Sequence, residues 1–442
     1  MKFIFKASFF LFIFFLISCK KDKKDTQAPG IGCFLPAVGQ HYKMFDTIIV
    51  NAQVTDNEHL SSVNVTLTDL NHAPLQASYS VPIPSAGFTF TIKYILTQFH
   101  LQTGTYFIQI NADDGYNTSS YYQPIIITES PTQLWGYCTV LKSTSQTINQ
   151  IDTLGNPISS IVLSQAYNGI KYGGYYQQLY VNGKGTRPFQ SFNLQAQTAN
   201  QLNYGASATV NQVDYASLYT DGYKPYVGFL NSDVNSFDNT GAYGTSYRLN
   251  DINFYPYLFT KTSNYSVGVF KSKIPANNPD KIVSFTGFGA SYQSTALPTI
   301  NFTVVAVFEK GQDSVYVLGN DANNQAQAYI YYVPSNSFPI QLSNMPPNKM
   351  LSAVKVSSSY FIFSTASSIY SYQYTNSNCI SNLLLGAQKL AYQPKLNRLV
   401  AAAGTSLNSY YVGTSSLTPV SGAHSSINCG DSIIDFEVIT NK

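Results

Sequence analysis

The chain has 442 residues, a formal net charge of +3 and only 11% charged residues. This length exceeds what one hydrophobic core normally supports, so about two or three domains are expected. The lysines are spread out apart from one N-terminal cluster, which excludes the basic footprint of a nucleic-acid-binding protein. The 35 Tyr and 28 Phe residues favour pleated, half-buried strands and predict an all-β protein.

The N-terminal residues have the pattern of a secretory signal. An apolar run over residues 7–17 follows Lys2 and Lys6 and leads into the tetrapeptide LISC at residues 16–19. A membrane-spanning helix needs roughly 20 apolar residues, so this shorter run predicts a cleavable signal peptide over residues 1–18. The tetrapeptide resembles the lipobox of bacterial lipoproteins. The resemblance implies that Cys19 is lipidated and becomes the first residue of the mature chain; a plain secretory signal with an incidental cysteine is the alternative.

The charged stretch KKDKKD at residues 20–25 has no apolar side chain to bury. It predicts a flexible tether over residues 19–27. The lipoprotein resemblance implies a lipid-anchored protein of the bacterial cell envelope, and the outer membrane is the favoured location. In some Gram-negative groups, mainly acidic residues after the lipidated cysteine direct a protein to the outer surface. This stretch is net basic, so the periplasmic and surface faces both stay open.

Cysteine usage agrees with export. After Cys19 is lipidated, four cysteines remain, at positions 33, 138, 379 and 429, an even number in an oxidising compartment. We favour a disulfide between Cys379 and Cys429, both near Asn/Ser-rich turns, with unpaired buried thiols as the alternative. The spacing of the cysteines fits no zinc site, and no metal is expected there.

Residues 28–129 have the alternating apolar and polar pattern of half-buried strands. About seven short strands in roughly 100 residues are typical of a β-sandwich. The clearest of them cover residues 46–56, 60–67, 88–92, 104–113 and 121–128. The segments IIVNAQVTDNEHLSSVNVTL and GTYFIQINADDGYN resemble Ig-like or PKD-like modules, which implies a stalk or adhesive spacer.

Three aspartates follow strands of this predicted sandwich. Asp56, Asp113 and Asp114 have the hard oxygen ligands that calcium requires. Aspartates also cap turns by accepting hydrogen bonds from their own backbone. We favour the turn-capping role and expect no bound metal.

Residues 130–442 contain no sustained helical spacing and many short apolar-aromatic runs. A unit of strand, tight turn, strand and longer loop recurs at roughly 40–50 residues, a period that indicates propeller blades. The length then allows about six to eight blades, and a seven-bladed β-propeller is favoured over further sandwiches in series. Residues 134–141 and 432–439 are predicted to close the ring by sharing a blade.

The sequence contains no recognisable catalytic set. Only Arg187, Arg248 and Arg398 are available for an arginine triad, and His424 is the single histidine after residue 129. A lone loop histidine has no partner to orient it, and the phosphate-loop, nucleophile-elbow and paired histidine motifs are missing. The sequence therefore favours a binding protein over an enzyme and predicts no cofactor.

Two tyrosine-rich loops are the candidate binding residues, because a tyrosine ring stacks on a sugar face while its hydroxyl hydrogen-bonds. They contain Tyr172, Tyr175 and Tyr176 in the first loop and Tyr223 and Tyr226 in the second. Packing of these rings between blades is the alternative. We therefore expect a membrane-anchored binding or scaffold module for a protein or glycan ligand. The competing hypothesis is a propeller-type glycan-processing enzyme, which requires several carboxylates at the mouth of the central channel.

Overall fold

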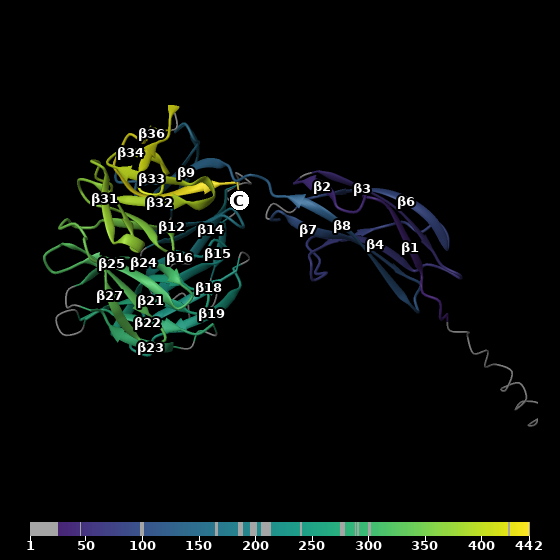
Figure 1. The fold of residues 1–442 in the computed structure, drawn as a ribbon, viewed down its shortest axis with the longest axis horizontal. Helices are drawn as coiled ribbons and strands as arrows, with labels where there is room; N and C mark the ends of the chain where they lie inside the picture. Colours follow the sequence, from purple (N-terminus) through teal and green to yellow (C-terminus); the bar gives the residue numbers. More distant parts are fainter. Residues whose placement is uncertain are drawn as a thin grey trace, which may run out of the picture. The chain divides into compact units, whose positions relative to one another are not determined.

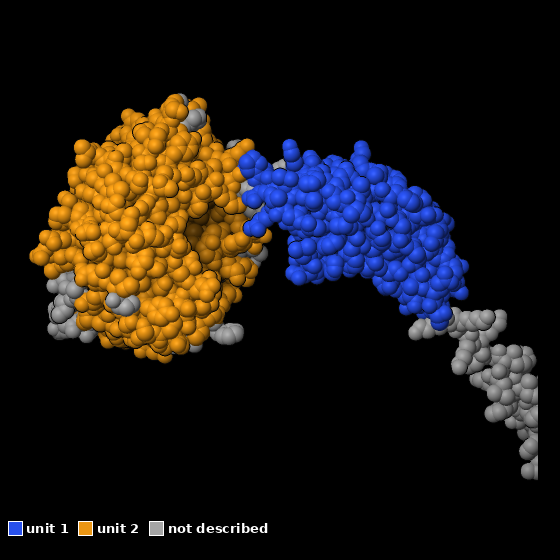
Figure 2. Space-filling model, in the orientation of Figure 1, with its two compact units in different colours: residues 1–131 blue, residues 132–442 orange. Residues whose placement is uncertain are grey.

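A computed structural model describes residues 25–44, 46–97, 101–163, 167–183, 189–194, 201–204, 214–238, 241–274, 279–287, 289, 291–298, 302–422 and 425–441. The chain divides into two compact units, Met1–Pro131 and Thr132–Lys442 (Figures 1 and 2). The signal peptide and the lipidation site predicted at residues 1–18 and Cys19 lie outside the described residues, as does His424. No helix in the described part of the chain is both long and apolar enough to cross a membrane.

Unit 1 is built from two sheets that share one hydrophobic core (Figure 1). Strand β3 shows why: Ile48, Val50, Ala52 and Val54 alternate with outward residues and are completely buried, as a strand covered on one face requires. The first sheet has the order β1 (Gly30–Leu35), β3 (Thr47–Thr55), β6 (Gly87–Ile95). The second has the order β2 (Gln40–Lys43), β8 (Thr118–Thr128), β7 (Gly104–Asp113), β4 (Ser62–Thr68), β5 (Tyr79–Ser80).

Unit 2 consists of seven antiparallel sheets in its described part, each with a path of four strands. The first sheet has the order β11 (Pro157–Val162), β10 (Thr147–Ile151), β9 (Leu134–Leu141), β37 (Ile433–Thr440). The next three are β12 (Tyr167–Gly173), β13 (Gln178–Gly183), β14 (Phe189–Asn193), β15 (Gln201–Tyr204); β16 (Tyr215–Thr220), β17 (Pro225–Phe229), β18 (Asp233–Phe237), β19 (Tyr243–Arg248); and β20 (Phe254–Lys261), β21 (Ser266–Ser272), β22 (Lys281–Phe285), β23 (Ser291–Ala296).

The last three sheets follow in chain order. They are β24 (Thr303–Gly311), β25 (Ser314–Asn320), β26 (Ala326–Tyr332), β27 (Ser337–Gln341); β28 (Ser352–Ser357), β29 (Tyr360–Ser364), β30 (Ile369–Gln373), β31 (Asn378–Leu383); and β32 (Lys389–Gln393), β33 (Arg398–Ala403), β34 (Ser406–Val412), β35 (Leu417–Pro419), with β36 (Ser426–Asn428) also paired to β34. Two short 3₁₀ helices, η2 (Tyr374–Asn376) and η3 (Pro394–Leu396), connect strands within the last two sheets.

The seven sheets form a closed ring, which makes unit 2 a seven-bladed β-propeller. The innermost strands contact one another in the order β37, β12, β16, β20, β24, β28, β32, and β32 returns to β37. This closure rules out sandwiches in series. The first blade is completed by both ends of the unit, because β37 pairs with β9 from Ile433 opposite Leu141 to Thr440 opposite Leu134. The predicted sharing of a blade by these two segments is confirmed.

The blades pack through their second and third strands, which are covered on both faces. Every residue of β13, β17 and β29 is buried, and separate apolar clusters fill the spaces between neighbouring blades. The innermost strands differ, because one of their faces lines the axis of the ring. Polar residues on that face determine the chemistry of the channel.

Candidate functional site

The axis of the propeller encloses a cavity of about 360 Å³. Six of the seven innermost strands contribute to its wall, and most of the lining side chains are apolar or aromatic. The polar side chains in this wall include Lys171 from β12, Lys355 from β28 and the tyrosines Tyr219, Tyr257 and Tyr392. A ligand pocket usually combines apolar walls with a few polar groups, and the accessible surface of this cavity is about as polar as it is apolar.

Beside this cavity, charged residues from three neighbouring blades converge. Asp435 and Glu437 are two residues apart on β37, so their side chains leave the same face of the strand. The Nζ atom of Lys171 lies 2.8 Å from Oε1 of Glu437. Lys389 on β32 pairs with Asp435 and lies 3.5 Å from Glu437, and Tyr167 on β12 donates its hydroxyl proton to Asp435. These five residues are called the channel cluster below.

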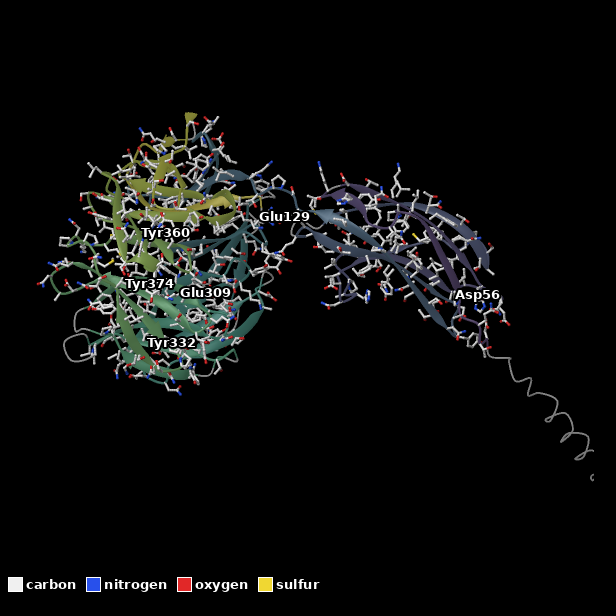
Figure 3. All side chains as sticks on the ribbon, viewed as in Figure 1. Asp56, Glu129, Glu309, Tyr332, Tyr360 and Tyr374 are labelled. Atoms are coloured by element: carbon white, nitrogen blue, oxygen red, sulfur yellow. The ribbon has the colours of Figure 1, made fainter. Side chains whose placement is uncertain are left out.

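A second ion pair crosses the channel wall between other blades. Lys355 on β28 lies 2.8 Å from Oε2 of Glu309 on β24, and Figure 3 labels Glu309 within unit 2. Both side chains are about one-third exposed. Like the channel cluster, this pair joins the innermost strands of adjacent blades. Each of the three channel carboxylates thus has a lysine partner.

Burial and neighbouring charges separate the proton affinities within the channel cluster. Burial, supported by the adjacent Glu437, raises the pKa of Asp435 well above its usual value. Burial alone would raise the pKa of Glu437 too, but Lys171 and Lys389 outweigh it and lower that pKa. Burial, together with Lys171, lowers the pKa of Lys389 to about 7. Near neutral pH the cluster therefore combines the ionised carboxylate of Glu437 with Lys389, which exchanges its proton in that range.

We expect Lys389 to lose its proton near pH 7, whereas exposed lysines do so near about 10.4. The positive charge of Lys389 is then present below neutral pH and lost above it. Since the unfolded chain retains this proton up to the higher pH, the residue's own contribution to stability increases as pH rises from about 7 to about 10. A ¹³C NMR titration of the lysine-labelled chain checks this, with Lys389→Arg identifying the signal. A midpoint above pH 9 would contradict the expectation.

Three of the five predicted binding tyrosines meet at the surface of unit 2. The turn after β12 carries Tyr175 and Tyr176, and the turn after β16 carries Tyr223. The ring centroids of Tyr175 and Tyr223 are 4.5 Å apart, and those of Tyr175 and Tyr176 are 4.7 Å apart in an edge-to-face arrangement. Tyr223 is 53% exposed and Tyr176 36% exposed. These three residues are called the tyrosine cluster below.

The backbone holds the tyrosine cluster in place. The amide of Tyr175 donates to the carbonyl of Gly222 at 3.1 Å, which joins the turns of two adjacent blades. Asp221 supports the second turn, because its Oδ1 accepts the amide protons of Tyr223 and Lys224. Two exposed rings are therefore presented on a defined framework.

The remaining two predicted binding residues, Tyr172 and Tyr226, are core residues. Tyr172 is 7% exposed and donates its hydroxyl proton to the carbonyl of Thr440 at 2.6 Å. Tyr226 is 3% exposed and donates to Oδ2 of Asp221 at 2.8 Å. Both lie on strands, where alternate side chains point into the packing between blades. The prediction that they contact ligand is corrected accordingly.

The cysteine prediction is also corrected. Cys379 and Cys429 both carry free thiols in this structure, as do Cys33 and Cys138. Cys379 packs against the apolar cluster of Phe361 and Tyr372, whereas Cys429 packs against a different cluster that contains Phe436. Burial raises the pKa of Cys379 to about 12, which keeps its thiol protonated and unreactive.

Sequence reasoning missed the channel cluster. Asp435 and Glu437 carried a usable signal, because two carboxylates alternate with buried Phe436 and Val438 in an otherwise apolar strand. Charges at such positions need partners. The partners Lys171 and Lys389 lie hundreds or tens of residues away in the chain, and only ring closure brings them together.

Comparisons with known proteins identify no family. No protein-family model matches this sequence, and no curated protein is similar to it. A quinonprotein alcohol dehydrogenase-like protein from Bacteroides thetaiotaomicron is 12% identical with a TM-score of 0.44, over 93% of this chain and 99% of that chain. BamB from Moraxella catarrhalis is 14% identical with a TM-score of 0.40, over 67% and 85% of the two chains. Similarities this low indicate nothing about activity or ligand.

Proposed function

We propose that this chain is a lipid-anchored protein of the bacterial cell envelope whose propeller binds a protein or glycan ligand without catalysing a reaction. In this proposal Cys19 carries the lipid, residues 19–27 lead from it to the sandwich, with Asp25 already buried against that domain, and unit 1 is an Ig-like stalk. The favoured location is the outer membrane. The proposal for the propeller depends on one observation, the exposed tyrosine cluster.

The tyrosine cluster supports binding because large flat rings contact ligand at little cost in side-chain entropy. Tyr223 and Tyr176 each expose more than a third of their surface although their neighbours already pack against them. Their hydroxyl groups are positioned at the polar tips of these rings, where a sugar hydroxyl or a backbone carbonyl is a suitable partner. The channel carboxylates, in contrast, already have lysine partners.

We expect the double variant Tyr176→Ala and Tyr223→Ala to lose at least about tenfold in affinity for a ligand found on glycan and protein arrays, since exposed aromatic anchors typically contribute over 1 kcal/mol each. The measurement is titration of that ligand into the purified full chain. Tyr332→Ala is the matched control: Tyr332 is 41% exposed on β26 (Figure 3). Equal affinity of all three proteins would contradict a role for the tyrosine cluster.

A second candidate function is favoured by the channel cluster. Two carboxylates whose pKa values are displaced in opposite directions, as those of Asp435 and Glu437 are, are the arrangement that acid–base catalysis on a glycan uses. Product analysis after incubation with the arrayed glycans separates the two functions. Turnover that disappears in Asp435→Asn but persists in Glu309→Gln would establish the enzyme and overturn the non-catalytic proposal.

A further inference from the structure

Three aspartate carboxylates meet at one end of unit 1. Asp25, Asp56 and Asp114 each offer an oxygen atom, and these atoms all lie within 4.8 Å of one another. The residues come from three separate segments: the start of the described chain, the residue after β3, and the turn between β7 and β8. Figure 3 shows Asp56 at the end of unit 1 where the described chain begins, opposite the end that carries Glu129.

Local hydrogen bonds orient each carboxylate and leave one oxygen of Asp25 and one of Asp56 without a partner, whereas Oδ2 of Asp114 accepts from Nδ2 of Asn117 at 3.0 Å. Oδ1 of Asp56 accepts the amide protons of Glu58 and His59 at 2.9 and 3.0 Å, while its Oδ2 is buried without a hydrogen-bond partner. Oδ1 of Asp114 accepts the amide protons of Tyr116 and Asn117, both at 2.6 Å. One oxygen of each carboxylate is thereby fixed by the backbone.

Asp25 is the residue that separates this group from an ordinary set of turn aspartates. It is only 6% exposed, and its Oδ2 is buried without a hydrogen-bond partner. Its Oδ1 accepts from the amide of Gln27 and from Nδ2 of Asn57. A buried charged oxygen that lacks a partner costs several kcal/mol in a protein, so the arrangement requires compensation.

The described side chains form no ion pair that would compensate this charge. None of the ion pairs found among the described residues includes Asp25, Asp56 or Asp114. The ionisable residues close in sequence to Asp56 and Asp114 are Glu58, His59 and Asp113, and the charge of His59 lowers the pKa of Asp114. Two of these three neighbours add negative charge.

We propose that Asp25, Asp56 and Asp114 together bind one calcium ion. Calcium takes hard oxygen ligands at 2.3–2.6 Å, so its ligands lie at most about 4.6–5.2 Å apart, and the three carboxylates fit within that span. Zinc is disfavoured because the group contains only carboxylates and no cysteine or histidine. Magnesium demands near-ideal octahedral geometry, whereas calcium accepts ligands from three independently constrained segments.

The bound ion joins the first described residue of the chain to the sandwich. Asp25 has no strand partner, and its hydrogen bonds come from the amide of Gln27 and from the side chains of Asn57 and Asn117. Calcium adds a link from this segment to the end of β3 and to the turn after β7. It therefore orders the junction between the predicted tether and unit 1. This role is independent of what the propeller binds.

The test is calorimetric titration of calcium chloride into the purified full chain after treatment with EDTA. We expect one site per chain with a dissociation constant of about 10⁻³ M or tighter, the range of extracellular modules, and a thermal midpoint several degrees higher in 10 mM calcium. Magnesium at the same concentration should produce a smaller shift.

Asp25→Asn and Asp56→Asn should each weaken calcium binding at least tenfold. The amide side chain introduced by Asp56→Asn retains an oxygen that accepts the two backbone amide protons, so this variant should fold normally, as circular dichroism checks. The matched control is Asp69→Asn, because Oδ1 of Asp69 also accepts two turn amides, from Asn71 and Ala73, but lies outside the group. Absence of calcium binding by the unmodified chain, or equal binding by all four proteins, would overturn the proposal.

Discussion

Deletion of residues 433–442 is expected to abolish the cooperative unfolding of unit 2. They contain β37 (Ile433–Thr440), which is the innermost strand of the first blade and the partner of β9. The strand buries four apolar side chains, Ile433, Phe436, Val438 and Ile439, each at most 3% exposed. Their burial contributes on the order of 6–12 kcal/mol, which is comparable with the whole stability of a typical domain.

The same deletion removes the charged contacts that join three blades. Asp435 pairs with Lys389 of the last blade, and Glu437 pairs with Lys171 of the second. Without these carboxylates, Lys171 and Lys389 lose their partners, since Glu309 is already paired with Lys355, and leaving one partner of a buried pair uncompensated is strongly destabilising. Differential scanning calorimetry should show that the transition of unit 2 is lost.

The control for this deletion is a variant in which β37 is moved from the C-terminus to a position just before β9. The amide of Asn441 donates to the carbonyl of Gln133 at 3.1 Å, so the end of β37 already lies beside the start of β9. Placing residues 430–441 ahead of Gln133 converts the two strands into a β-hairpin and should restore the transition. A deletion variant that unfolds at the same midpoint as the intact chain would show that ring closure is dispensable.

Replacement of Cys19 by serine is expected to move the protein from the membrane fraction to the soluble fraction. The lipobox LISC implies several acyl chains on the mature N-terminus, and each buried methylene contributes about 0.8 kcal/mol to membrane binding. Serine has no thiol to receive the lipid, so the anchor is lost altogether. Fractionation of cells followed by immunoblotting measures the distribution, and mass spectrometry of the N-terminal peptide measures the acyl adduct.

Cys33→Ser is the matched control for the anchor. Cys33 lies in β1 and donates its thiol proton to the carbonyl of Leu35, so its replacement leaves the lipobox intact. This variant should stay in the membrane fraction. Retention of the Cys19→Ser protein in the membrane, or an N-terminal peptide that lacks lipid in the unmodified protein, would refute the anchoring proposal while leaving the propeller and the calcium site untouched.

Local sequence patterns predicted much of the fold. Alternation at residues 46–56 anticipated β3, because every second side chain there is fully buried. The repeat of strand pairs anticipated the propeller and its closure, because each blade has the same hydrogen-bonded unit and contacts only its neighbours. The tyrosine cluster was partly predictable, since Tyr175, Tyr176 and Tyr223 occupy turns whose residues are exposed wherever the chain folds back.

Other assignments needed the positions of side chains in space. Tyr172 and Tyr226 are close in sequence to exposed tyrosines but lie on strands that pack between blades. The disulfide prediction failed because proximity of Cys379 and Cys429 to similar turns says nothing about which cluster each thiol enters. The sequence does not show whether such a tyrosine is buried or exposed, or which residues surround such a cysteine, since both depend on the face of the strand that the residue occupies.

The sequence by itself determined the all-β character, the repeated blades and the lipobox pattern, because each depends on residues that are near one another in the chain. It also contained a strand pattern at each end of unit 2, and these two strands, β9 and β37, close the ring. Only the tertiary structure decided which charges meet. It placed Lys171 and Lys389 against β37. It also showed that the third aspartate beside Asp56 and Asp114 is Asp25 and not Asp113, as the sequence had suggested. Asp113 and Asp114 are adjacent, and Asp113 instead accepts from Gly115 and Thr118. Electrostatic contacts form through space, and a linear pattern does not contain the distances that govern them.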